Sequence, residues 1–159
     1  MLHAALKLVH LLSLVAWIGG MFFTLVCLRP ALGVLDAPAR PRLMSAVLRR
    51  FFAVVEVAIG LVLLTGLGLL WSARHGAGPG SGAGMPPSWT LMVVLGVAMM
   101  LVFACLRAVL YPRLQVALRA QDGPAAAAVL ARIRGWVLVN LVLGVLIVAA
   151  MALGAAVGL

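Results

Sequence analysis

Four runs of about twenty apolar residues constrain this chain more than any other feature of its sequence. They lie at about 8–28, 51–71, 89–110 and 136–159. A helix of roughly 20 apolar residues spans the ~30 Å hydrocarbon core of a bilayer. Only helices and closed barrels satisfy their backbone hydrogen bonds there, and none of these runs alternates as a barrel strand does. The sequence therefore predicts an all-α integral membrane protein, with residues 1–159 forming one transmembrane domain.

The basic residues predict how the helices are oriented. Of the twelve Lys and Arg residues, five arginines lie in each of two connections, 29–50 and 107–134. Cytoplasmic connections are enriched in such cations. Both connections are therefore expected on the cytoplasmic side of a bacterial-type inner membrane, with both termini on the outer, periplasmic side. Each connection joins antiparallel neighbours, so the simplest topology is a four-helix up-down bundle.

Composition removes several classes of function. Hydrophobic residues make up 66% of the chain and charged residues only 9%, far from the values of soluble domains. A net charge of +9 would suggest nucleic acid in a soluble protein, but here the cations flank membrane spans and no nucleic acid partner is expected. The sequence also lacks a nucleophile–base pair and a phosphate-binding loop. The expected partner is the lipid bilayer, and a homo-oligomer is left open.

Polar residues at one membrane depth form the first candidate site. Glu56 lies five residues into the second span, and Arg107 lies about four residues from the end of the antiparallel third span. Asn140 and Thr24 fall in the same layer at 1.5 Å per helical residue. Charges inside a span are costly, so we expect a Glu56–Arg107 pair braced by Asn140. It acts either as an assembly clamp or as a proton relay or anchor for an acidic group.

A stripe on the first span forms the second candidate site. His3, His10, Trp17 and Thr24 are spaced by seven residues, with Lys7 on the same side. A heptad spacing keeps side chains on one helix face. Imidazole at this depth can ligate haem iron or copper, pass a proton, or simply bond a neighbouring helix. Met92, at similar depth on the third span, is either a second ligand or apolar filling.

The same residues resemble a known family. His10 precedes Trp17 by seven residues, Gly19 and Gly20 follow, and Arg29 and Pro30 lie beyond. This opening helix is similar to that of CopD-like membrane proteins, a superfamily linked to copper uptake or resistance that includes HemJ-type protoporphyrinogen oxidases. Further similarity lies at 48–52, 64–66, 133–134 and 140–144. The resemblance implies that His10 is a haem or metal ligand, with Trp17 in its packing context.

Three functions follow from these observations. The first is a haem b protein that uses His10, with Met92 or His3 as second ligand and Lys7 near the propionates. It would exchange electrons with a quinone, a copper protein or a porphyrin substrate, as a haem-dependent membrane oxidoreductase does. The second is a copper permease in which His3 and His10 bind the ion. The third is a non-catalytic assembly partner whose polar residues only specify packing.

Overall fold

The computed structural model describes residues 1–76 and 87–157, which form helices joined by short connections. The elements are α1 Leu2–Phe23, the π-helical turn η1 Thr24–Leu28, α2 Arg29–Ala31, the 3-10 turn η2 Leu32–Val34, α3 Ala39–Gly76, α4 Pro87–Cys105, the π-helical turn η3 Leu106–Leu110, α5 Tyr111–Arg119 and α6 Gly123–Val157. Since η1, α2 and η2 continue α1, and η3 and α5 continue α4, the chain builds four long helical rods. The described residues contain no strand.

The predicted all-α membrane fold is confirmed. Four helices are long and apolar enough to cross a membrane: 2–34, 39–72, 88–119 and 123–153. Each is longer than the corresponding apolar run. The additional turns carry most of the arginines, so the rods project beyond the expected bilayer at the basic end. Which end faces the cytoplasm stays a prediction from those charges.

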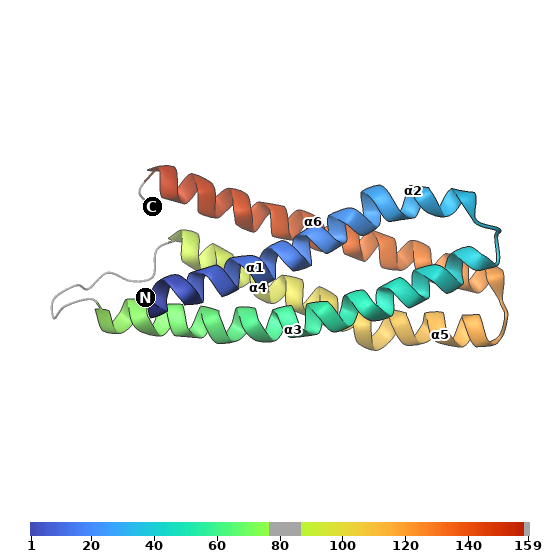
Figure 1. Ribbon diagram of the computed structural model, residues 1–159, viewed down its shortest axis with the longest axis horizontal. Coiled ribbons are helices and arrows are strands. Elements are labelled where there is room, and N and C mark those ends of the chain that lie inside the picture. Colours follow the sequence, from blue (N-terminus) through green and yellow to red (C-terminus); the bar gives the residue numbers. More distant parts are fainter. Residues whose placement is uncertain (77–86, 158–159) are drawn as a thin grey trace.

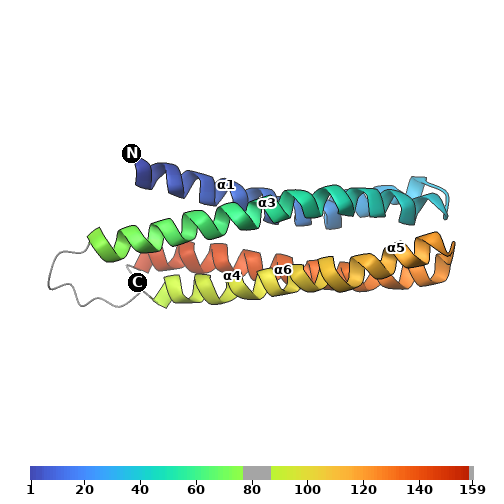
Figure 2. The same cartoon turned by 90° about the horizontal axis from the view of Figure 1, so that it is seen from below.

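The rods form two helical hairpins that pack against each other. In Figure 2, α1 and α3 form one layer, and α4, α5 and α6 form the other. The start of α1 and the end of α6 lie at the same end of the bundle (Figure 1), as an up-down topology requires. The principal neighbours of α1 are α3 and α6, while α4 packs mainly on α6. This places α1 and α4 on opposite corners of the bundle.

Prolines explain the two π-helical turns. Each turn ends two residues before a proline, η1 before Pro30 and η3 before Pro112. A proline lacks a backbone N–H and clashes with the carbonyl four residues earlier. In both turns the preceding residue instead donates to the carbonyl five residues back, from Arg29 to Thr24 and from Tyr111 to Leu106. The helix thus continues past each proline with one residue inserted into its ladder.

The connection between α5 and α6 is a tight helical hairpin turn. The N–H of Asp122 donates to the carbonyl of Ala117 and that of Gln121 to Leu118, the two bonds of a Schellman motif. Gln121 adopts φ 54°, the left-handed conformation that this motif requires. Asp122 then caps α6, because its side-chain carboxylate accepts the N–H of Ala125 at 2.8 Å.

An aromatic cluster fills the core between the two hairpins. Phe103 lies between Trp17 and Phe52, with ring centroids 6.2 and 5.6 Å away and edge-to-face geometry. Tyr111 extends the cluster from Phe52 at 5.4 Å. Trp17 and Phe52 are almost fully buried. Edge-to-face rings add to the burial of their apolar surface, so this cluster stabilises the crossing of all three rods involved.

Candidate functional site

The clearest polar contact in the half of the bundle that holds the N-terminus joins His10 of α1 to Thr65 of α3. The imidazole Nδ1 lies 2.9 Å from Thr65 Oγ1. Thr65 is buried, and its hydroxyl also donates to the carbonyl of Leu61. A hydroxyl has one proton to donate. Since the short contact to the Leu61 carbonyl takes that proton, we assign Nδ1 of His10 as the donor in the other bond.

This arrangement decides which tautomer His10 adopts. A neutral imidazole protonated at Nδ1 carries its lone pair on Nε2. Metal-bound histidines are held in the same way, with one ring nitrogen bonded to the protein and the other on the metal. Gly66 lies beside the ring, where a Cβ would come 3.5 Å from Cε1 of His10. Thr65 and Gly66 of α3 therefore hold the imidazole from one side.

His3 repeats this contact one heptad nearer the end of the helix. Its Nδ1 lies 3.3 Å from Oγ of Ser72, and Ser72 donates to the carbonyl of Leu69 at 2.9 Å. Histidines seven residues apart on α1 thus meet hydroxyls seven residues apart on the antiparallel α3. His3 is exposed and His10 half-buried, so the two imidazoles lead from the surface into the bundle.

Other residues expected near His10 have different surroundings. Trp17 is a core residue packed on Phe103. Lys7 is exposed on α1. Met92 is half-buried on α4 and packs against the apolar core, on a helix whose main neighbour is α6 and not α1. The structure therefore brings His3 and His10 onto one helix pair with α3, and Met92 as a ligand of the same group stays a prediction.

The described residues contain no group of three or more His, Cys, Asp or Glu side chains placed to share a metal ion. A closed tetrahedral site of the zinc type is thus not formed within this part of the chain. Imidazoles with few neighbouring ligands suit an ion that accepts low coordination by nitrogen and sulfur, such as Cu(I), or one axial position of a haem.

The polar layer near the basic end divides into separate contacts. Arg107 Nε donates to Glu56 Oε1 at 2.7 Å, and the two side chains are 47% and 48% exposed. The guanidinium also lies 5.8 Å from the ring centroid of Tyr111. The pair joins η3 to α3 on the outside of the bundle. Both residues face outward in a membrane-spanning segment, where the partner charge and the Tyr111 ring shield them from lipid.

Asn140 and Thr24 do not brace this pair, which corrects our expectation of one cluster. Asn140 is buried, and its Nδ2 donates to Met21 Sδ at 3.7 Å while Oδ1 has no partner in the described structure. Thr24 donates to the carbonyl of Gly20 at 2.7 Å. The four residues share a depth, but their helices turn them to different sides.

Sequence reasoning missed the hydroxyl partners Thr65 and Ser72. A signal was present, because both residues repeat the seven-residue spacing of His3 and His10 on the next span. In an antiparallel pair, two matching heptad spacings predict paired contacts. Sequence reasoning also missed a pocket at the basic end that contains Arg29 and Arg134, described below.

Comparison with known proteins gives one result. Residues 45–154 match the family described as copper resistance protein D. The chain belongs to the CopD family. The match covers α3 to α6 and their connections, including Thr65, Glu56 and Arg107, but begins after α1 and its histidines. No curated protein and no solved structure matches the chain.

Proposed function

We propose that this CopD-family membrane protein binds copper ions in the outer half of its bundle, with His10 as the main ligand. The observation that supports this proposal is the His10–Thr65 contact, which leaves the Nε2 lone pair of a half-buried imidazole unprotonated. The family's link to copper resistance identifies copper as the ion of first choice. Copper is here the cargo, and the chain provides its binding positions.

His3 and His10 would act in succession. Seven helical residues separate their Cα atoms by about 10 Å. The two rings are held at separate residues of α3, His3 at Ser72 and His10 at Thr65, so we infer two separate positions for the ion. An ion would first meet exposed His3 and then half-buried His10. In the opposite half of the membrane the soft side chains Cys27 and Cys105 are both free and exposed. The outward-facing Glu56–Arg107 pair takes no part in this path.

A haem b protein is the second candidate, because the same Nε2 lone pair of His10 would ligate haem iron. His10 fits one axial position. Met92 of α4 stays the expected second axial ligand, and α4 packs mainly on α6, so haem would need its ligands from two helices that are not principal neighbours. When bound, haem would provide one-electron chemistry, while Thr65 would hold the imidazole ring in place.

A metal and spectral analysis of purified protein tests both candidates. We expect copper bound near one equivalent in protein loaded with Cu(I), and loss of that copper in His10→Ala. Thr65→Val keeps the side-chain volume but removes the hydroxyl. Loss of such a supporting hydrogen bond lowers metal affinity by roughly 10-fold or more.

Ser13→Ala is the matched control, since Ser13 is a buried residue whose hydroxyl donates to the Val9 carbonyl of its own helix. It should leave copper affinity unchanged. A Soret band that shifts on reduction and disappears in His10→Ala would replace the copper proposal with the haem one. Unchanged copper binding in His10→Ala would overturn the assignment of His10.

A further inference from the structure

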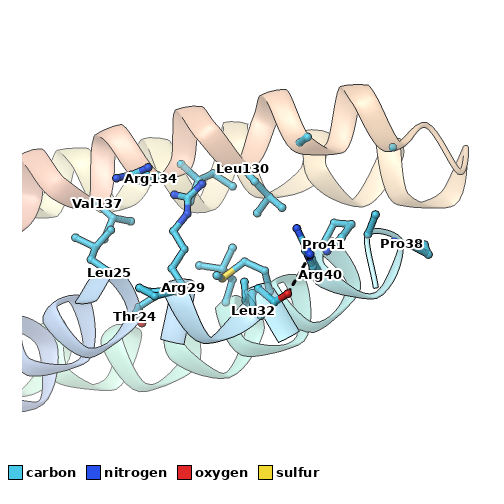
Figure 3. A pocket seen from close by; sticks show the side chains of 18 of the residues that line it. Thr24, Leu25, Arg29, Leu32, Pro38, Arg40, Pro41, Leu130, Arg134 and Val137 are labelled. Carbon is cyan, nitrogen blue, oxygen red and sulfur yellow. Dashed lines mark hydrogen bonds between the residues drawn. The ribbon is translucent and has the colours of Figure 1, made fainter. Parts of the chain in front are cut away.

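A pocket of about 810 Å³ opens at the basic end of the bundle, between α6 and the segment from η1 to the first turns of α3. Figure 3 shows that its side chains come from both hairpins. Most of its lining is apolar, including Leu25, Leu48, Leu130, Ile133 and Val137. Nothing in the copper proposal uses this pocket. Arg29 is nineteen residues from His10 on the same rod, a separation of about 28 Å along the helix.

Three arginines line the pocket, and none of the described lining residues is acidic. One arginine is occupied by the backbone: Arg40 donates from Nε to the carbonyl of Leu35 at 2.8 Å and from Nη2 to that of Gly33 at 3.1 Å. It thereby fixes the loop at the pocket mouth. The other two, Arg29 and Arg134, come from opposite hairpins.

Arg29 extends across the pocket toward α6, the helix that carries Arg134 (Figure 3). Arg29 is half-buried and Arg134 is exposed, and the charge of Arg134 acts unfavourably on that of Arg29. Two like charges beside an apolar wall are costly unless an anion lies between them. A guanidinium pair of this kind matches the geometry of a phosphate group, which accepts paired N–H donors.

We propose that this pocket binds an anionic phospholipid, with its phosphate between Arg29 and Arg134 and an acyl chain along the apolar wall. The lining combines a positive mouth with an apolar wall, as an amphiphile requires and a soluble anion does not. Its depth agrees as well. The mouth lies at the end of the bundle that carries ten of the twelve cations, where the phosphates of the cytoplasmic leaflet are expected.

Lipid retention by the detergent-purified full chain tests this proposal. Native mass spectrometry would count bound phosphatidylglycerol after titration, with phosphatidylcholine as the uncharged comparison. We expect one tightly held phosphatidylglycerol. The double variant Arg29→Gln/Arg134→Gln should bind it roughly 30-fold more weakly, as expected for two lost cations near a lipid phosphate.

The charge-matched control is Arg113→Gln/Arg132→Gln, because both arginines are exposed and outside the pocket lining. It should retain the lipid. Leu130→Trp fills the apolar part of the pocket and should displace the lipid although all arginines remain. The melting temperature of each variant in detergent shows whether that variant is folded. Without lipid, the Arg29→Gln/Arg134→Gln protein should melt at or above the wild-type temperature, because a repulsion has been removed. If it does not fold, Arg134→Gln alone serves.

Three results would overturn the proposal. Equal loss of lipid in the control double variant would mean general attraction of the basic end. Unchanged binding in Leu130→Trp would mean that the acyl chain lies elsewhere. Displacement of the lipid by millimolar inorganic phosphate would assign the arginines to a soluble anion. None of these results bears on copper binding at His10, so the two proposals fail independently.

Discussion

Glu56 and Arg107 show at the level of single residues how this bundle tolerates charge in its membrane-spanning part. Their side chains are half-exposed on the outer surface, yet the carboxylate and the guanidinium are 2.7 Å apart. Tyr111 supports the arginine through its ring face. An unpaired charge facing lipid costs several kcal/mol. Removing one partner should therefore destabilise the protein more than removing both.

Double-mutant analysis of this pair gives a first prediction. Glu56→Gln and Arg107→Gln should each lower the free energy of unfolding, because each leaves one charge in the membrane without its partner. The double variant should be about 1–3 kcal/mol more stable than the sum of the single effects implies. Unfolding in bicelles measures this coupling. Additive single effects would show that the ion pair does not act as a unit.

At the level of helices, close packing depends on small residues. Two adjacent glycines on α1 show this. A Cβ on Gly20 would lie 2.5 Å from Cε2 of Phe51 on α3, whereas a Cβ on Gly19 would meet nothing within 4 Å. Gly144 of α6 is similar to Gly20, with Ile18 of α1 2.9 Å from its virtual Cβ. Small residues thus let α1 pack tightly against both of its neighbours.

The second prediction compares the two adjacent glycines. Gly20→Ala should destabilise the protein by about 1–3 kcal/mol, because the new methyl group displaces the Phe51 ring from the core. Gly19→Ala adds the same methyl group in open space and should leave stability equal or slightly higher, since alanine favours helix. Thermal unfolding of both proteins in the same detergent makes the comparison. Equal melting temperatures would contradict the close α1–α3 packing.

The turn between α5 and α6 gives a third prediction at this level. Gln121 holds a left-handed conformation that glycine adopts without steric cost. Gln121→Gly should therefore raise the free energy of unfolding by about 0.5–1 kcal/mol. The control is Gln115→Gly. Gln115 lies inside α5 and donates to Ser45 Oγ at 2.7 Å, so this change should lower the stability of the protein. A loss of stability in Gln121→Gly would contradict the Schellman geometry of the turn.

The orientation of the whole molecule in the membrane is the fourth prediction. The ends of α1 and α6 lie together, opposite the turns that join α2 to α3 and α5 to α6. Because the arginines concentrate at those turns, both termini should face the periplasm. Alkaline phosphatase fused to the C-terminus should be active and a green fluorescent protein at the same place should be dark. The reverse pattern would place the His10 site on the cytoplasmic side and the arginine pocket on the periplasmic side.

Sequence reasoning was most successful where a pattern acts along the helix axis. The four helices follow from hydropathy, and the shared level of Glu56 and Arg107 follows from the rise of 1.5 Å per residue. It also recognised the CopD family, which the match to residues 45–154 confirms. It went wrong over the cluster of Glu56, Arg107, Asn140 and Thr24, since equal depth does not mean contact.

Length, apolar composition and charge determined by themselves that this protein crosses a membrane with four helices, because a bilayer accepts few other backbones. Only the tertiary structure decided which helices are neighbours and how each one is rotated about its axis. That rotation turns Asn140 inward to Met21 and the Glu56–Arg107 pair outward. It also places His10 on Thr65. Successive residues turn by about 100° around a helix, and packing at the glycines and aromatic rings selects one rotation among several of similar hydrophobicity.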